Sequence, residues 1–253
     1  MFNVKGKALA VTGGAQGLGR EFALSFAREG AKVAVVDING EKAESVAAEI
    51  IAAGGEAIAV QLDVTDLAAA EAMAKTVNDT FGSFDILINS AAIFSTIKLQ
   101  PFYEMPIEEY RHVIDVNMTG TLITSRAAAP YMMEQKWGRI INMTSCSFFE
   151  GRGNYVHYTS SKAGVIGITR AIARELGGFG ITANAIAPGA TVTEVPRETV
   201  NEEWKKKVMA NRCVQRTQVP EDLVGIAMFM ASDESEFMTG QTVVVDGGMI
   251  FLP

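Results

Sequence analysis

The chain has 253 residues, a net charge of -7 and 48% hydrophobic residues. This length is enough for one sizeable hydrophobic core, and α/β proteins of this size are routinely one domain, so we expect residues 1–253 to form a single domain. The acidic balance argues against nucleic acid or an anionic membrane as a partner. Cys146 and Cys213 give neither a disulfide framework nor a metal-ligand spacing, so no metal site is predicted.

The apolar runs of the sequence predict neither a membrane span nor a signal peptide. No apolar run reaches the roughly 18 residues that a membrane-spanning helix needs. The apolar run that ends at Thr12 is too short for the hydrophobic region of a signal peptide, and it is typical of a first strand. We therefore expect a cytoplasmic protein.

Short apolar runs alternate with longer amphipathic stretches along most of the chain. Such alternation of wholly apolar strands with helices indicates a parallel sheet covered on both faces. Right-handed crossovers then give an α/β fold with a Rossmann-like, doubly wound sheet of seven strands. We expect residues 190–212, which break the alternation, to form a substrate lid. Strands are predicted at 8–12, 32–36, 57–62, 84–88, 139–143, 181–186 and 242–245, and helices near 17–29, 41–53, 66–81, 107–135, 156–177 and 220–231.

A glycine-rich loop follows the first predicted strand and opens the first predicted helix. Glycine lets the backbone approach a pyrophosphate closely, and a helix N-terminus offers free N–H groups with a partial positive charge. Gly13, Gly17 and Gly19 are spaced G-x-x-x-G-x-G, which differs from the commoner G-x-G-x-x-G. A plain turn could have this composition, but the position directly after a strand favours dinucleotide binding.

Asp37 ends the second predicted strand, twenty residues beyond Gly17. This separation is typical of a carboxylate that holds the ribose hydroxyls of an adenosine, although a turn aspartate at a strand end is the alternative. The carboxylate would repel a 2′-phosphate, and neither Gln16 nor Ile38 supplies a cation to bind one. The sequence therefore favours NAD over NADP.

Tyr158 and Lys162 are four residues apart on a predicted helix, and Ser145 precedes the tyrosine by thirteen residues. Residues four apart share a helix face, so the ammonium favours the phenolate form of the tyrosine. Bringing a phenol of pKa near 10 close to neutrality corresponds to about 4 kcal/mol. The serine hydroxyl can bind the oxygen whose proton the tyrosine takes. On its own, the spacing is also common in solvated or packing pairs, so its weight comes from the rest of the chain.

Taken together, these residues resemble the short-chain dehydrogenase/reductase family from about residue 5 to 250. The order of the motifs carries the resemblance, and the second half is similar to members that oxidise aryl secondary or pyridoxal-type alcohols. Ala92 replaces the family's usual glycine, which predicts a turn without positive φ. The motifs are Thr12-Gly13-x-x-x-Gly17-x-Gly19, Asp63-Val64, Asn89-Ser90-Ala91-Ala92, Asn117, Ser145, Tyr158-x-x-x-Lys162 and Pro188-Gly189.

The resemblance implies a dinucleotide-binding and catalytic domain that usually assembles as a homotetramer. It implies Tyr158 as the general acid/base, Lys162 as its pKa-lowering partner, Ser145 as the ligand of the substrate oxygen, and Asn117 as the anchor of a water in a proton path. The residues implied to bind the cofactor are Gly13, Gln16, Gly17, Leu18, Gly19, Asp37, Ile38, Asp63, Val64, Asn89, Ala91, Tyr158, Lys162, Pro188, Gly189, Thr191 and Thr193.

The substrate pocket is expected at the loops that follow the carboxyl ends of the strands. An apolar and aromatic wall without a cation cluster predicts hydride transfer between NAD(H) and a neutral hydrophobic or aromatic alcohol or ketone. Core or oligomer contacts are an alternative for about half of this wall. Arg152 could meet a substrate carboxylate, although a surface position is expected. The predicted substrate residues are Ser145, Phe94, Cys146, Phe149, Tyr158, Val192 and Val195.

Other functions remain open at this point. A protein that binds NAD without turnover is disfavoured by the intact Ser145, Tyr158 and Lys162. A dehalogenase-like enzyme of the same fold is disfavoured because such enzymes lack the glycine loop. A nucleophilic thiol at Cys146 is disfavoured because no helix N-terminus or certain histidine partner is evident for it.

Overall fold

A seven-stranded parallel sheet organises the computed structural model, which describes residues 2–196 and 202–252. Its strand order is β3-β2-β1-β4-β5-β6-β7, so the direction of winding reverses between β1 and β4. This is the doubly wound sheet predicted from the sequence, and its ligand crevice is expected at that reversal. The strands are β1 (Ala8–Thr12), β2 (Lys32–Asp37), β3 (Glu56–Gln61), β4 (Ile86–Asn89), β5 (Gly138–Met143), β6 (Ile181–Pro188) and β7 (Thr242–Val245).

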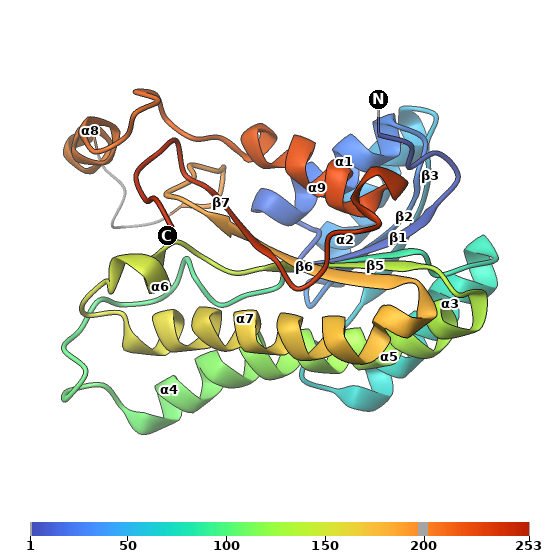
Figure 1. Cartoon of the computed structure of the whole chain (residues 1–253), viewed down its shortest axis with the longest axis horizontal. Helices are drawn as coiled ribbons and strands as arrows, with labels where there is room; N and C mark the ends of the chain where they lie inside the picture. The colour runs from blue at the N-terminus through green and yellow to red at the C-terminus, as the bar shows by residue number, and fades with distance from the viewer. Residues whose placement is uncertain (1, 197–201, 253) are drawn as a thin grey trace.

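Helices cover both faces of the sheet (Figure 1). One face carries α1 (Gly17–Arg28), α2 (Gly40–Ala52) and α9 (Val224–Ala231), and the other carries α3 (Leu67–Phe81), α4 (Ile107–Ile114), α5 (Gly120–Gln135) and α7 (Val156–Leu176). Two short helices, α6 (Ser147–Glu150) and α8 (Glu202–Ala210), lie near the carboxyl ends of the strands. No helix among the described residues is long and apolar enough to cross a membrane.

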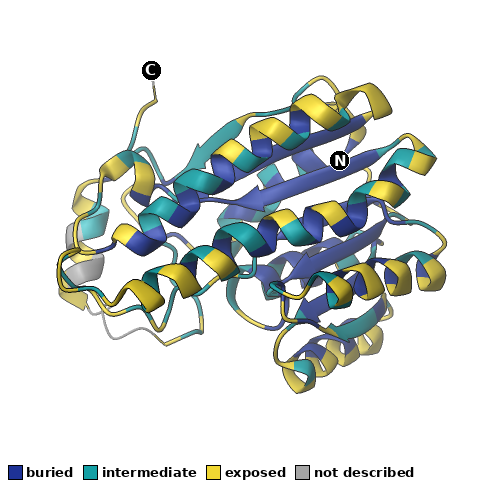
Figure 2. Ribbon diagram, turned by 90° about the horizontal axis from the view of Figure 1, so that it is seen from below, coloured by how far each residue is buried: buried dark blue, intermediate teal, exposed yellow. Residues whose placement is uncertain are grey.

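The central strands β1, β4, β5 and β6 are buried along their whole length because each contributes side chains to two hydrophobic clusters, one on either face of the sheet (Figure 2). In β1, Leu9 and Val11 pack into the cluster under α1, α2 and α9, whereas Ala8 and Ala10 pack into the cluster under α3, α5 and α7. Successive strand side chains point to opposite faces, which explains why the sequence runs are uniformly apolar rather than alternating.

Four segments differ from the predicted elements. The helix expected at 107–135 is interrupted by a π-helical turn over Asp115–Thr119, and the helix expected at 220–231 begins as a 3-10 turn over Pro220–Leu223. Helices α6 and α8 were not predicted because four and nine residues give too short a periodic pattern. The proposed lid at 190–212 includes residues 197–201, which lie outside the described residues.

A buried polar network lies under the crevice, between β4, β5 and the helices that cover them. The Asn89 amide donates to Ser125 Oγ at 3.0 Å and to Asn142 Oδ1 at 2.8 Å, and its oxygen accepts from Thr124 Oγ1 at 2.7 Å. The Asn142 amide donates to Thr169 Oγ1 of α7 at 2.9 Å, which extends the network to that helix. Asn89 is only 3% exposed, so water cannot replace the hydrogen bonds that its side chain makes.

Replacing Asn89 with alanine should therefore destabilise the fold. The substitution leaves buried partners unpaired, and we expect the free energy of unfolding to fall by about 2 kcal/mol or more. Urea denaturation at pH 7 measures this loss. Thr80→Ala, at an exposed position of α3, is the control and should change stability by less than about 0.5 kcal/mol. Equal stability of the two variants would contradict the network's importance.

Candidate active site

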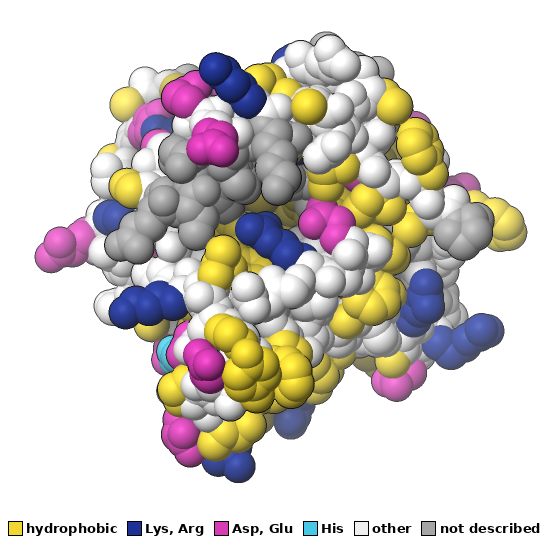
Figure 3. Space-filling model, turned by 90° about the vertical axis from the view of Figure 1, so that its left-hand side faces the viewer, with side chains coloured by type: hydrophobic (Ala, Val, Ile, Leu, Met, Phe, Trp, Pro, Cys, Tyr) yellow, Lys and Arg dark blue, Asp and Glu magenta, His cyan; other side chains and the backbone are white. Residues whose placement is uncertain are grey.

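A cleft of about 750 Å³ opens at the carboxyl edge of the sheet, where the winding direction reverses. Figure 3 shows this face, with hydrophobic side chains around a central hollow and basic and acidic side chains at its mouth. Of the residues predicted to bind cofactor or substrate or to act in catalysis, all line the cleft except Asn89, Asn117, Phe149 and Val192.

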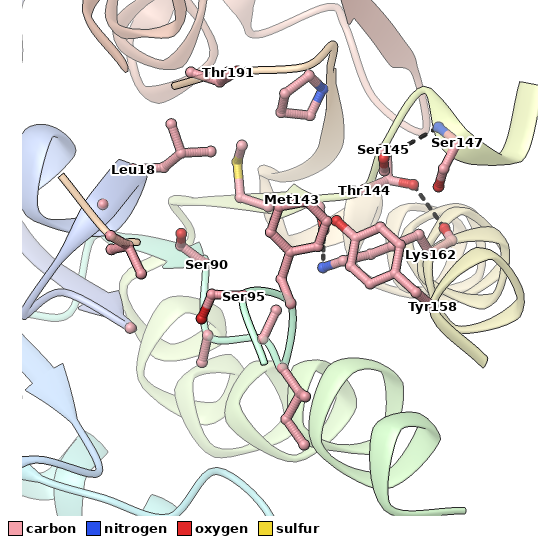
Figure 4. Close-up of a pocket in the computed structure, with 18 of the residues that line it drawn as sticks. Leu18, Ser90, Ser95, Met143, Thr144, Ser145, Ser147, Tyr158, Lys162 and Thr191 are labelled. Carbon is pink, nitrogen blue, oxygen red and sulfur yellow. Dashed lines mark hydrogen bonds between the residues drawn. The ribbon is translucent and has the colours of Figure 1, made fainter. Parts of the chain in front are cut away.

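Lys162 connects α7 to the end of β5 through both its side chain and its backbone. Its ammonium donates to the Met143 carbonyl at 2.8 Å, and its own carbonyl accepts from Thr144 Oγ1 at 2.6 Å (Figure 4). The side chain is almost fully buried, and burial lowers the pKa of Lys162 to about 8. A cation is thus fixed against the floor of the cleft.

Tyr158 projects from the same face of α7 as Lys162 (Figure 4). The Lys162 ammonium nitrogen lies 5.8 Å from the centre of the Tyr158 ring. The ring packs against Phe94 with a centroid distance of 4.8 Å and against Tyr155 with a distance of 5.0 Å. Only 7% of Tyr158 is exposed, so these neighbours hold its ring in one place within the cleft wall.

Ser145 lies just beyond the end of β5, across the cleft wall from α7 (Figure 4). Its Oγ accepts the backbone N–H of Ser147 at 3.1 Å. A hydroxyl that accepts this bond keeps its own proton available for donation to another oxygen. Ser145, Tyr158 and Lys162 all line the cleft, so the sequence-distant trio meets in one place.

Asn117 lies in the π-helical turn, outside the cleft lining. Its side chain accepts the N–H of Ile93 at 2.7 Å and donates to the Ile93 carbonyl at 3.1 Å and to Ser161 Oγ at 3.2 Å. It therefore ties the loop after β4 to α7 beside Lys162. A water-linked proton path through this residue stays a prediction.

Two glycines of the loop adopt left-handed backbone conformations, and the first of them also packs too closely against its neighbour for a side chain. A Cβ on Gly13, at φ +65°, would lie 2.8 Å from Ala91 Cα, and Gly17 has φ +59°. Both conformations are costly for other residues. The turn at Ala92 does not adopt positive φ, as the alanine predicted.

The N-terminus of α1 already binds an anionic group of this chain. The backbone N–H of Gly17 donates to the Glu194 carboxylate at 2.8 Å, at the end of α1 where the helix dipole favours negative charge. The carboxylate is a stand-in for a phosphate oxygen, so the residues fit the pyrophosphate of a dinucleotide at this point. The segment Thr193–Val195 lies against the glycine loop. If Gly17 carried a Cβ atom, that atom would lie 3.6 Å from Val195 Cγ2.

Two carboxylates lie where the adenosine part of a dinucleotide is expected. Asp37 accepts the N–H groups of Ala15 at 3.1 Å and Asn39 at 3.0 Å, which fixes its carboxylate at the end of β2. Asp63 accepts both the backbone N–H and the hydroxyl of Thr65, and these hydrogen bonds lower the pKa of Asp63. Both carboxylates are thus held in place by hydrogen bonds on the cleft wall.

The predicted substrate wall needs correction at two positions. Phe149 packs edge-on against Phe148 within α6, at a centroid distance of 5.0 Å, and does not line the cleft. Thr191 and Thr193 line the cleft, whereas Val192 between them does not, as expected where extended backbone alternates its side chains.

The Cys146 thiol, although in the lining, donates to the Ala187 carbonyl at 3.3 Å. Burial raises the pKa of this thiol far above its ordinary value. A reactive thiolate is therefore disfavoured at this position.

Sequence reasoning missed several polar members of the cleft lining. Arg152 lines the cleft rather than the outer surface, and its neighbour Glu150 lines it as well. Desolvation raises the pKa of the Glu150 carboxyl group, and the charge of Arg152 opposes that shift. Other polar members that were missed include His112, Tyr155 and Asn211, and only their loop or helix positions near strand ends could have indicated them.

Known proteins resemble this chain in sequence and in fold. A family model described as enoyl-(acyl carrier protein) reductase matches residues 13–250. A 3-oxoacyl-[acyl-carrier-protein] reductase of Synechocystis is 40% identical over 242 residues, which is 95% of each chain. The chain belongs to the short-chain dehydrogenase/reductase family. As a member of this family it is an oxidoreductase of a class that uses nicotinamide cofactors.

Other members of the short-chain dehydrogenase/reductase family extend the comparison. An L-rhamnose 1-dehydrogenase (NAD(P)(+)) of Azotobacter vinelandii is 37% identical over 249 residues, 96% of each chain. A crystal structure from Agrobacterium tumefaciens, provisionally described as a gluconate dehydrogenase, has a TM-score of 0.91 at 33% identity and covers 98% of this chain and 97% of that one. The fold and the family are thus shown across nearly the whole chain.

Removing the Lys162 charge should change the pH dependence of stability in a defined direction. The folded protein binds this proton less tightly than the unfolded chain, so wild-type stability rises as pH increases from about 8 to 10.5. Relative to Lys162→Met, the wild type should gain about 3 kcal/mol between pH 7 and pH 10.5. Urea denaturation across this range measures the difference. Parallel pH profiles for the two proteins would show that burial does not perturb Lys162.

Glu194→Gln should strengthen pyrophosphate binding at α1. The Glu194 carboxylate and a pyrophosphate compete for the same N–H of Gly17, so removing the charge should lower the Kd for ADP-ribose by about two- to fivefold. Adenosine lacks a pyrophosphate and is the control ligand, for which the Kd should not change. Titration calorimetry on both proteins measures these constants. Unchanged or weaker ADP-ribose binding by the variant would contradict the competition.

Proposed function

We propose that this oxidoreductase transfers a hydride between NAD(H) and a hydrophobic or aromatic alcohol or ketone. The observation that carries the proposal is the meeting of Ser145, Tyr158 and Lys162 in one cleft, beside the rings of Phe94 and Tyr155. This aromatic wall supports a neutral reacting end of the substrate, since the cation beside Tyr158, Lys162, is buried and already bound to the Met143 carbonyl.

The positions of the three side chains support the following proton transfer. The Ser145 hydroxyl donates a hydrogen bond to the substrate oxygen and so orients that oxygen toward Tyr158. During oxidation Tyr158 takes the hydroxyl proton of the substrate as a general base, and during reduction it returns that proton. Lys162 stabilises the phenolate by its charge and holds the nicotinamide ribose. The cofactor, when bound, accepts or donates the hydride.

The choice of NAD over NADP rests on Asp37. Its fixed carboxylate can accept both ribose hydroxyls, and it would repel a 2′-phosphate. Lys42 is a nearby cation that would favour a 2′-phosphate, because its ammonium donates to Gln16 Oε1 at 3.1 Å on the same rim of the cleft. One exposed lysine offsets the repulsion only in part. The name of the Azotobacter relative allows both cofactors, so NAD preference is a property that we propose for this chain.

Tyr158→Phe should abolish most of the turnover while leaving the cleft intact. The substitution removes only the hydroxyl, so we expect kcat to fall by about 10²- to 10⁴-fold and the Kd for NAD to change little. NADH formation from a panel of aryl and alicyclic secondary alcohols measures the first quantity, and titration calorimetry the second. The same assay with NADP tests the cofactor preference. Near-normal turnover in the variant would refute the role of Tyr158.

A further inference from the structure

Arg152 is a cation of the cleft that the proposed chemistry does not use. Among the described residues that line the cleft, Lys162 and Arg152 are the two with lysine or arginine side chains. Lys162 is buried and bound to the Met143 carbonyl. Arg152 is half-buried, and its guanidinium has no hydrogen bond or salt bridge with any described residue. Its charge is therefore available to a ligand in the cleft.

The backbone and one ring hold Arg152 in this position. Helix α6 ends at Gly151, whose φ of +60° turns the chain, and the Arg152 N–H then donates to the Ser147 carbonyl at 3.2 Å. The guanidinium carbon lies 4.9 Å from the centre of the Tyr155 ring, which is itself buried. A guanidinium in contact with a ring through its face keeps the N–H groups of its edge free for a planar, two-oxygen acceptor.

An apolar path joins this guanidinium to the reacting hydroxyl. Tyr155, which contacts Arg152, packs on Tyr158 at a centroid distance of 5.0 Å, and Phe94 contacts both tyrosines at 6.2 and 4.8 Å. The path suits a flat or aliphatic segment of a substrate that reaches from Tyr158 toward Arg152. Glu150 is the adjacent carboxyl group, but no salt bridge within 4.0 Å joins it to Arg152 among the described residues.

We propose that Arg152 binds a carboxylate at the far end of the substrate. The substrate class is then a hydrophobic hydroxy acid or keto acid, in which an aromatic ring or a short apolar segment separates the carboxylate from the reacting carbon. This inference rests on the proposed alcohol or ketone chemistry, and it replaces the wholly neutral substrate expected from the sequence. Arg152 determines specificity and takes no part in the proton transfer.

Matched pairs of ligands test this role directly. 1-(4-carboxyphenyl)ethanol and its neutral carboxamide are the substrates, and 4-acetylbenzoate and 4-acetylbenzamide are the binding probes, each measured with NAD present. The wild type should prefer the acid over the amide by about 10- to 100-fold in kcat/KM and in Kd, since a charge-assisted hydrogen bond contributes on that scale. Arg152→Gln should remove the preference, so that the ratio of acid to amide in kcat/KM and in Kd lies within about threefold of one.

Two further variants separate charge from structure. Arg152→Lys keeps the charge but loses the planar pair of donors, so it should retain part of the preference. Arg111→Gln removes an exposed arginine of α4 and should behave as the wild type. A wild type that does not bind 4-acetylbenzoate more tightly than the amide, or a glutamine variant that keeps the preference, would overturn the inference.

The two proposals fail in different ways. Turnover of the carboxamide without any preference for the acid would leave the dehydrogenase function standing and reject the role of Arg152. Absence of turnover for every alcohol with NAD and NADP would reject the proposed function, and the binding comparison of the two acetyl probes would still decide on Arg152.

Discussion

The site depends on one constraint, the fixed position of a buried ammonium. Lys162 reaches the Met143 carbonyl with its side chain and receives the Thr144 hydroxyl on its own carbonyl, so α7 is attached to the last residues of β5 twice. This attachment sets the distance between Tyr158 on the helix and Ser145 beyond the strand. Burial of the cation is unfavourable and lowers its pKa to about 8, so the fold accepts a cost in stability to place a charge under the cleft.

The remaining charges of the cleft are arranged around that ammonium by the parallel sheet. Strand carboxyl ends meet at one edge, which brings Asp37 and Ser145 to the same cleft although β2 and β5 are separated in the sheet. The N-terminus of α1 adds a positive dipole end, shown to accept an anion by its contact with Glu194. Arg152 adds a second cation to the lining of the cleft. The cleft of this acidic protein thus still offers positive charge where the anionic parts of ligands are expected.

Regular features of the sequence predicted the fold well, because short, mainly apolar runs that alternate with amphipathic stretches indicate buried strands between helices. The glycine loop and the Tyr158–Lys162 pair followed from local spacing. The substrate wall was harder, since it is built from irregular loops whose side chains alternate in ways that no periodicity marks. Val192 and Phe149 turn away from the cleft for this reason, and Arg152 turns toward it because Gly151 has a left-handed conformation. The π-helical turn at Asn117 likewise depends on tertiary hydrogen bonds to Ile93.

A crystal structure of the protein with NAD and an unreactive ketone tests the central claim most directly. The account predicts that the Lys162 ammonium keeps its bond to the Met143 carbonyl and lies within hydrogen-bond distance of the nicotinamide ribose, with the ketone oxygen between Ser145 and Tyr158. A ribose bound elsewhere, or a Tyr158 ring turned out of the cleft, would contradict it.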